Sequence, residues 1–536
     1  RATGIHPLIA FVAGGLAVWV VLTFVVAGGT HAHRSGHTSG SSSALELPAG
    51  PLDGSVVPAA DAPTVPDGGP NAAALWVHDT ALLPAAPIAL LAAAGLPVEI
   101  VHDASSAFRH PLVLSWPRTD LSQHERDAFA AYSKRGGTLL AIAPDAVTRE
   151  ALVGRRGAVI ARLASVPETG LQNGGLRDQQ IAALRRWWTA TPGGFRLGDA
   201  PAGRAQAVVF VHDVRSDAAI AAAPALALAE HELGVHATWP IETKYLSDEA
   251  GGPLVGRERS VVAAIRAAGG EVASGGVSGV DLARLGVGDG REAYPAYSPA
   301  QASPTQLVGA SVLGEARVGR HLLGALGGGT SNVFRGVGRE TAAGFAGALE
   351  AAGVTTDATL AATHAGGAFP FLQSESDGGV RPVLRFPVSF EALPGERLDQ
   401  RVGAMMAIVL AHRRSGAPTL LAFEPAGAGR IAAERSVVRQ LGGDAWIGSL
   451  ETLASWWRVR DAMAVDVRPG PDGSGWVIRV TAPPGIAHAQ TLVAPFDVAS
   501  AATGDGRALP LYGSRRIALP DFSGTLEVQV ARTVGS

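Results

Sequence analysis

The sequence predicts a multi-domain α/β protein, and three observations support this prediction. The chain has 536 residues, more than one hydrophobic core usually organises. From residue 73 onward, short apolar runs alternate with helix-like segments, as they do in parallel α/β sheets. Residues 464–536 instead alternate apolar and polar side chains between Gly, Pro and Asp turns, which is typical of a small β-sandwich.

The composition excludes several classes of function. A net charge of -3 gives no basic footprint, so we expect no nucleic-acid partner. The chain has 0 cysteines, which removes disulfides, thiolate metal sites and any cysteine nucleophile. Hydrophobic residues make up 47% of the chain and charged residues 17%, which favours a globular protein with some membrane character.

The first element is a predicted transmembrane helix within residues 1–30. Pro7 to Gly29 contains 23 residues without a charge, and about 20 helical residues cross a bilayer core. The apolar region of a signal peptide is shorter, about 7–15 residues, and precedes a small-x-small cleavage site that is missing here. We therefore expect a retained single anchor and not a buried core helix. Its small residues could contact another membrane helix: Ala10, Gly14 and Gly15.

Residues 31–72 are rich in Gly, Ser, Pro and Ala, which predicts a flexible linker. His31, His33 and His37 lie in this linker. A His-x-His pair can bind a metal ion, but in a Gly/Ser-rich tether solvated polar sequence is the more common role.

Residues 73–150 predict a Rossmann-like parallel α/β domain. Strands are expected at Ala73–Val77, Val98–Val101, Pro111–Ser115 and Thr138–Ala143, with helices at Leu82–Ala94 and Ser122–Arg135. Ser122 is the expected N-cap of the second helix, with Glu125 three residues later. The ending AYSKRGGTLLAIAP resembles the class I glutamine-amidotransferase-like fold, whose nucleophile is a Cys that this chain lacks. We therefore expect a scaffold or docking domain.

Residues 151–205 are predicted to be connecting helices. Leu176–Thr189 has a helical pattern, and Trp187 and Trp188 are expected to pack one domain on the next.

The run AVVFVHDVRSD, Ala207 to Asp217, is the main chemical landmark of the chain. Its apolar strand delivers His212, Asp213 and Asp217 to a strand end. In α/β barrels and open parallel sheets, ligands and catalytic groups gather at the carboxyl ends of the strands.

From this strand onward, residues 206–463 resemble the polysaccharide deacetylase family of carbohydrate esterases. The resemblance implies a deformed (β/α) barrel that hydrolyses acetyl groups with a bound metal ion. In the family, the first strand ends in paired Asp residues, of which one is the base and the other a metal ligand. Asp213 matches the ligand, and His212 stands in the place of the base. Arg335, in the run NVFRGVG, matches an Arg that orients the base; here we expect it to pair with Asp213 or another buried acid.

The remaining reactive positions depart from the family pattern. In the run GGEVASGGVSG, Gly275 and Gly279 occupy the places of two metal-binding His residues. The final strand carries Phe423 or Glu424 where the family has a catalytic His. A divalent cation requires three or four converging protein ligands, and Asp213 alone does not supply them, even with Asp217 or His212. We therefore expect no metal and no cofactor, and a binding role for Asp213, Arg335 and Asp357.

These observations predict a protein that is not an enzyme. We expect a single-pass bacterial membrane protein with its bulk on the periplasmic side, acting as a structural or glycan-binding subunit of a larger membrane complex. Its partners would be other membrane proteins, contacted through the anchor and the α/β domain.

An active enzyme is the alternative, either as a deacetylase with rearranged ligands or as a metal-free glycoside hydrolase acting on cell-envelope polysaccharide. Two carboxylates about 5–9.5 Å apart can hydrolyse a glycosidic bond without a metal ion. The candidate catalytic residues for such an activity are His212, Asp213, Asp217, Glu242 and Glu424.

Overall fold

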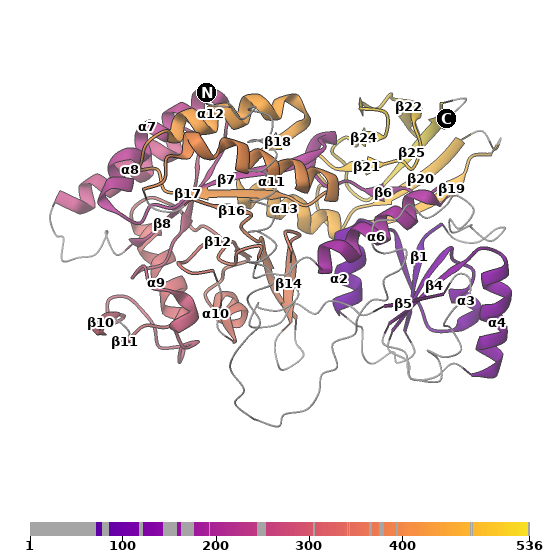
Figure 1. The fold of residues 1–536 in the computed structure, drawn as a ribbon, viewed down its shortest axis with the longest axis horizontal. Helices are drawn as coiled ribbons and strands as arrows, with labels where there is room; N and C mark the ends of the chain where they lie inside the picture. The colour runs from indigo at the N-terminus through magenta and orange to yellow at the C-terminus, as the bar shows by residue number, and fades with distance from the viewer. Residues whose placement is uncertain are drawn as a thin grey trace, which may run out of the picture. The chain divides into compact units, whose positions relative to one another are not determined.

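A computed structural model gives the fold of the chain (Figure 1). It describes residues 71–77, 85–116, 122–142, 158–161, 176–191, 193–243, 253–303, 306–339, 341, 343–363, 367–374, 380–392, 395–471, 473 and 475–533. The predicted anchor, the histidines at 31, 33 and 37, and nearly all of the predicted linker lie outside these residues. Among the residues described, no helix has the length and apolar character that crossing a membrane requires.

The first domain is a parallel sheet with strand order β2-β1-β3-β4-β5. Its strands are β1 (Ala73–Val77), β2 (Val98–Val101), β3 (Leu112–Trp116), β4 (Thr138–Ile142) and β5 (Ala158–Ala161), and its helices are α2 (Ala85–Ala94), α3 (Ala104–Ala107) and α4 (Gln123–Lys134). The predicted capping box is confirmed, because Ser122 accepts from the Glu125 N–H and the Glu125 carboxylate accepts from the Ser122 N–H. Strand β5 lies in a segment predicted to be helical. The reason is that its short apolar run Ala-Val-Ile-Ala completes the sheet beside β4.

The central domain contains a mixed sheet of ten strands that curls into a half-barrel. The order along its main path is β14-β15-β13-β12-β9-β8-β7-β17-β16, with β18 also pairing with β7. Among the described strands, β14 and β16 end this path and do not pair with each other, so the sheet is a half-barrel, where the sequence predicted a deformed barrel. The strands are β7 (Gln206–His212), β8 (Thr238–Ile241), β9 (Glu271–Ser274), β12 (Val333–Phe334), β13 (Thr356–Asp357), β14 (Phe371–Ser374), β15 (Val380–Arg385), β16 (Phe390–Glu391), β17 (Thr419–Phe423) and β18 (Ala445–Ile447).

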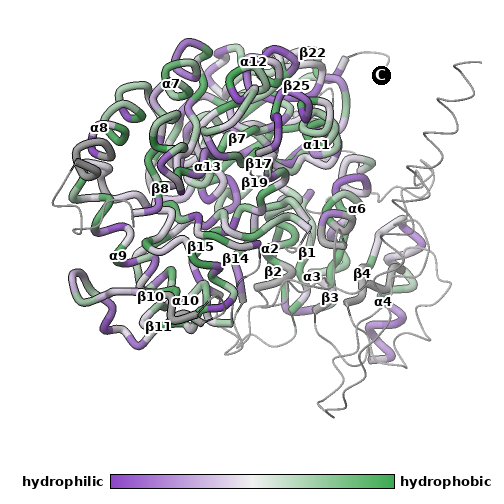
Figure 2. The backbone as a smooth tube through the Cα atoms, turned by 60° about the vertical axis from the view of Figure 1, so that its left-hand side comes forward, coloured by the Kyte–Doolittle hydropathy of each residue, from purple (hydrophilic) through white to green (hydrophobic). Residues whose placement is uncertain are grey.

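Strand β7 lies inside this sheet and is buried along its whole length. Its side chains alternate between two hydrophobic clusters: Val208 and Phe210 belong to one, and Val209 and Val211 to the other. The first cluster includes residues of four helices that cover this face, α7 (Asp217–Leu233), α8 (Pro253–Ala267), α11 (Val402–Ser415) and α12 (Arg430–Leu441) (Figure 1). Figure 2 colours the chain by hydropathy and labels β7 and β17 near the centre of this domain. The remaining elements are the hairpin β10 (Ala300–Ser303) and β11 (Gln306–Val308), and the helices α9 (Val312–Ala325), α10 (Phe345–Ala351) and α13 (Leu450–Asp461).

The C-terminal region forms two antiparallel sheets of four strands, with orders β19-β20-β25-β22 and β23-β24-β21-β6. The strands are β6 (Arg196–Leu197), β19 (Ala464–Pro469), β20 (Gly475–Thr481), β21 (Thr491–Val493), β22 (Val498–Thr503), β23 (Leu511–Tyr512), β24 (Arg516–Ala518) and β25 (Thr525–Arg532). The predicted all-β pattern is therefore confirmed. Strand β6 precedes the half-barrel in the sequence yet pairs with β21, so two distant segments build one sheet.

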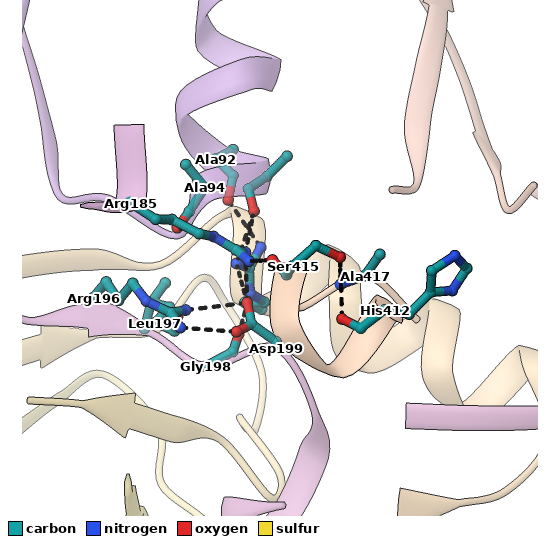
Figure 3. A network of polar contacts seen from close by, with 12 residues as sticks. Ala92, Ala94, Arg185, Arg196, Leu197, Gly198, Asp199, His412, Ser415 and Ala417 are labelled. Carbon is teal, nitrogen blue, oxygen red and sulfur yellow. Dashed lines mark hydrogen bonds and ion pairs between the residues drawn. The ribbon is translucent and has the colours of Figure 1, made fainter. Parts of the chain in front are cut away.

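A buried polar network joins these regions (Figure 3). Arg185, on helix α6 (Leu176–Ala190), donates to Asp199 Oδ1 at 2.5 Å, to the carbonyl of Ala94 at 3.1 Å and to the carbonyl of Ser415. Arg460 donates to the carbonyls of Gly198 at 2.6 Å and Ala92 at 2.8 Å. The network thus links the end of α2 to the segment after β6 and to the end of α11.

The predicted role of the Trp pair is also confirmed. Trp187 and Trp188 are buried in a hydrophobic cluster that includes Ala73 of the first sheet and Val209 of the half-barrel.

Candidate functional site

The carboxyl ends of several half-barrel strands bring four charged residues and Gly275 to one edge of the sheet. Asp213 follows β7, Glu242 follows β8, Gly275 follows β9, Arg335 follows β12, and Asp357 ends β13. In a parallel sheet this edge is where ligands gather. The three residues predicted to bind a ligand, Asp213, Arg335 and Asp357, therefore all lie at this edge.

Asp213 makes a bidentate ion pair that uses both of its oxygens. Arg335 donates from Nε to Oδ1 and from Nη2 to Oδ2, each at 2.9 Å, and Arg215 donates to Oδ1 at 3.0 Å. Burial by itself raises the pKa of Asp213, but the guanidinium groups of Arg215 and Arg335 outweigh it and hold the pKa below its usual value. Asp213 is therefore an ionised carboxylate with its charge matched by arginines.

Arg335 has two further partners at the same edge. It donates to the carbonyl of Ala358 at 2.7 Å and to Glu391 Oε1 at 3.0 Å. Glu391 also receives a hydrogen bond from the half-exposed Arg339 at 2.9 Å. The expectation that Arg335 pairs with Asp213 is confirmed.

Asp357, the third predicted binding residue, belongs to a separate pair. Arg385 Nε donates to its Oδ2 at 2.8 Å, and Thr359 donates its N–H and hydroxyl to Oδ1 at 3.0 and 2.6 Å. Both members of the ion pair are buried. Asp213 and Asp357 thus lie at the carboxyl ends of two strands, β7 and β13, that do not pair with each other, and each has its own arginine partner.

The two glycines at the places of the family's histidines are closely covered. A Cβ added at Gly275 would lie 2.8 Å from the carbonyl carbon of Ile241 and 2.9 Å from the amide nitrogen of Glu242. The reason is a backbone hydrogen bond of 2.8 Å from the Gly275 N–H to the Ile241 carbonyl. A Cβ added at Gly279 would lie 2.5 Å from Oε2 of Glu242, and Gly279 also has a φ of +64°. The buried Glu242 carboxylate therefore lies where a side chain at position 279 would begin.

Glu315 of helix α9 holds the loop that contains these glycines. Its Oε2 accepts from the N–H groups of Val277 at 2.7 Å and Ser278 at 2.9 Å, and its Oε1 accepts from the Ser278 hydroxyl at 2.7 Å. Tyr297 donates its hydroxyl to the same Oε1 at 2.8 Å. A carboxylate with this many donors fixes the backbone of Val277 and Ser278, which directly precede Gly279 in the loop.

The remaining predicted catalytic residues are dispersed. Asp217 is exposed in the first turn of α7, after the N-cap Ser216. Glu424 follows β17 and is half-buried. Its negative charge raises the pKa of Arg430, although burial lowers that pKa by more. Phe423, at the place of the family's last His, is buried in the hydrophobic cluster beneath the helices.

His212 lies on the opposite face of β7 from Asp213, because neighbouring strand residues point to opposite sides. Its Nε2 is 2.5 Å from Glu230 Oε1 of α7 and 3.8 Å from Glu434 Oε2 of α12. The rings of Trp239 and Phe423 lie 4.5 and 4.6 Å from the imidazole. Burial lowers the pKa of His212 to about 4 and raises that of Glu230 to about 8.

Sequence reasoning did not find Glu230 or Glu434, although a pattern for the first was present. The buried residues Ala219, Ala223, Leu226 and Ala227 place Glu230 on the same apolar face of α7, so its burial follows from helical spacing.

The metal ion implied by the family resemblance does not fit this edge of the sheet. Asp213 has both oxygens committed to arginines, and Gly275 and Gly279 bring no side chain. Arginine is a donor without an acceptor and cannot replace an imidazole as a ligand. What the residues form instead is an arginine–carboxylate network.

Three comparisons with known proteins gave matches among solved structures alone. No family model and no curated protein matches the chain. Among solved structures, a protein classed as a polysaccharide deacetylase from Mycobacterium smegmatis is similar over 48% of this chain and 93% of its own, with 19% identity and a TM-score of 0.36. A family 4 carbohydrate esterase from Streptomyces lividans is 17% identical over 46% of this chain and 93% of its own, with a TM-score of 0.28. A family 4 acetyl xylan esterase from Clostridium thermocellum is 14% identical over 47% of this chain and 91% of its own, with a TM-score of 0.27.

Proposed function

We propose that this chain is a catalytically inactive, deacetylase-like protein that acts as a structural or glycan-binding subunit of a membrane-attached assembly in the bacterial cell envelope. The observation that carries the proposal is the covered state of Gly275 and Gly279. Where the family pattern has two imidazoles, this chain has backbone contacts and the Glu242 carboxylate.

The charges at the sheet edge support the same proposal. Without a bound cation to acidify a water molecule, hydrolysis of an acetyl group needs another base and another oxyanion stabiliser. Asp213 and Asp357 are each the acceptor of a buried arginine. For Asp213 the arginines hold the pKa below its usual value, which makes this carboxylate a poor base. The buried charges at this edge are paired with one another, as Arg335 with Asp213 and Arg385 with Asp357.

The proposal predicts that the full chain releases no acetate from acetylated aminosugar oligomers or acetylated xylan. The assay measures acetate enzymatically with Zn²⁺, Co²⁺ or Mn²⁺ added in turn. The matched control is the Asp213→Asn variant, and we expect wild type and variant to give the same background. Metal-dependent acetate release that disappears in Asp213→Asn would contradict the proposal.

The same incubations test for a glycoside hydrolase. New reducing ends without added metal, lost in Glu242→Gln or Glu424→Gln, would favour that alternative.

The membrane attachment and the assembly rest on the uncharged segment Pro7–Gly29. We expect the full chain to sediment with membranes after washes in high salt and at high pH, and to be released by detergent. A chain with Leu8, Leu16 and Val21 changed to Asp is the comparison, because charged residues in the bilayer core are costly. Equal recovery of both chains in the soluble fraction would remove the anchor from the proposal.

A further inference from the structure

The face of β7 opposite the arginine network holds a second cluster of chemically active side chains. His212, Glu230 and Glu434 come from β7, α7 and α12, and each is buried, with relative exposures of 0%, 2% and 1%. One ligand atom from each residue lies within 4.8 Å of the other two. Nothing in the family resemblance assigns this cluster, since the family's metal site uses residues at the strand ends.

Glu434 is the residue that requires an explanation. Among the described residues, no backbone N–H, hydroxyl or arginine group donates to either of its side-chain oxygens. Its polar neighbours are the Glu230 carboxyl group and, at 3.8 Å, Nε2 of His212. A buried carboxylate without a partner is costly, so such a group is commonly paired or bound to a metal ion. Glu434 is held by α12 with its carboxylate beside the imidazole and the carboxyl group of Glu230.

The donor set matches one class of ion. Zn²⁺ and related divalent transition metals accept imidazole nitrogen together with carboxylate oxygen. Two carboxylates and one neutral imidazole balance the two charges of the ion, so the occupied cluster is neutral in a low-dielectric environment. Because carboxylates can bind through one or both oxygens, the three side chains can supply the four ligand atoms of a closed site.

We propose that His212, Glu230 and Glu434 form a structural site for a divalent transition metal of the Zn²⁺ class, which ties helices α7 and α12 to strand β7. The ion binds without an open coordination position, because the ligand atoms are buried. It supplies stability and no catalysis. This proposal does not depend on the proposed function, which concerns the other face of the strand.

The test measures metal content and stability of the full chain. The parent for all variants carries Ala at positions 31, 33 and 37, so that the histidines of the linker cannot bind the ion. After refolding with Zn²⁺ and removal of free metal on a chelating resin, we expect one Zn²⁺ per chain by mass spectrometry of the metal. Zn²⁺ should also raise the unfolding temperature, and Co²⁺ in its place should give visible absorption bands of a four-coordinate ion.

Matched variants separate this site from adventitious binding. Glu434→Gln preserves shape and removes one negative charge, and we expect at least tenfold weaker Zn²⁺ binding and loss of the temperature shift. Glu232→Gln, at an exposed position on helix α7, which also carries Glu230, should bind as the parent does. Circular dichroism checks that each variant folds. Absence of Zn²⁺ from the refolded parent, or equal binding by Glu434→Gln and the parent, would overturn the proposal.

Discussion

Replacing Arg335 by methionine should lower the free energy of unfolding by about 3–5 kcal/mol, the usual cost of removing one member of a buried ion pair. Arg335 is 2% exposed in its side chain and bonds to both oxygens of Asp213 and to Glu391. Methionine retains much of the apolar length but leaves Asp213 with Arg215 as its remaining charged partner. Urea unfolding followed by circular dichroism measures the change.

Arg339 offers the matched control for this experiment. It donates to the same Glu391 carboxylate at the same 2.9 Å as the Arg335–Asp213 contact, but its side chain is 51% exposed. Exposed ion pairs contribute about 0–1 kcal/mol, so Arg339→Met should have a small effect. Equal effects of the two substitutions would contradict the view that a buried network organises this edge. The double variant Asp213→Leu/Arg335→Met should be less destabilised than the sum of the single changes, because neither charge is left alone.

Much of the fold followed from local patterns. The strands around Trp76, Leu114 and Phe210 are short apolar runs between turn residues, and alternation with helices predicted their parallel pairing. The openness of the half-barrel did not follow, because it depends on which strands end the sheet. Strand β6 was missed because its two residues gain their pairing from β21, which lies almost 300 positions further along the chain.

The candidate site was predicted in part. Arg335 was expected to pair with Asp213 or another buried acid, because a buried charge is costly without a partner. The prediction that His212 lies beside the acids at the strand ends was wrong. Side chains along a strand alternate between its two faces, so His212 lies on the same face as Phe210 and Val208, which is covered by the helices. Glu434 could not be placed from sequence, because its position depends on how α12 packs against β7.

The close packing of backbone against Gly275 could not be predicted from the sequence either. A missing imidazole is visible in the sequence, but the backbone that closes the space is not. The distinction matters, because a histidine can be introduced where there is free space beside the glycine, but not where backbone atoms already fill that space.

Restoring histidine at Gly275 should therefore damage the fold and should not create a metal enzyme. Even Gly275→Ala places a Cβ within 3 Å of the backbone of Ile241 and Glu242. Overpacking of this kind costs typically about 1–3 kcal/mol, and the obstacle is main chain that carries a hydrogen bond of 2.8 Å between β8 and the residue after β9. Gly275→His adds a ring to the same contact, so its destabilisation should exceed that of Gly275→Ala.

Gly286→Ala is the control, because a Cβ at that position meets nothing within 4 Å, and its unfolding midpoint should stay close to that of the wild type. The variant Gly275→His/Gly279→His tests the chemistry directly. Asp213 remains bound to Arg335 and Arg215 in it, so a third ligand is still missing and no acetate should be released with Zn²⁺. A double variant that folds as stably as wild type and releases acetate would show that the glycines are the whole difference between this chain and an active deacetylase.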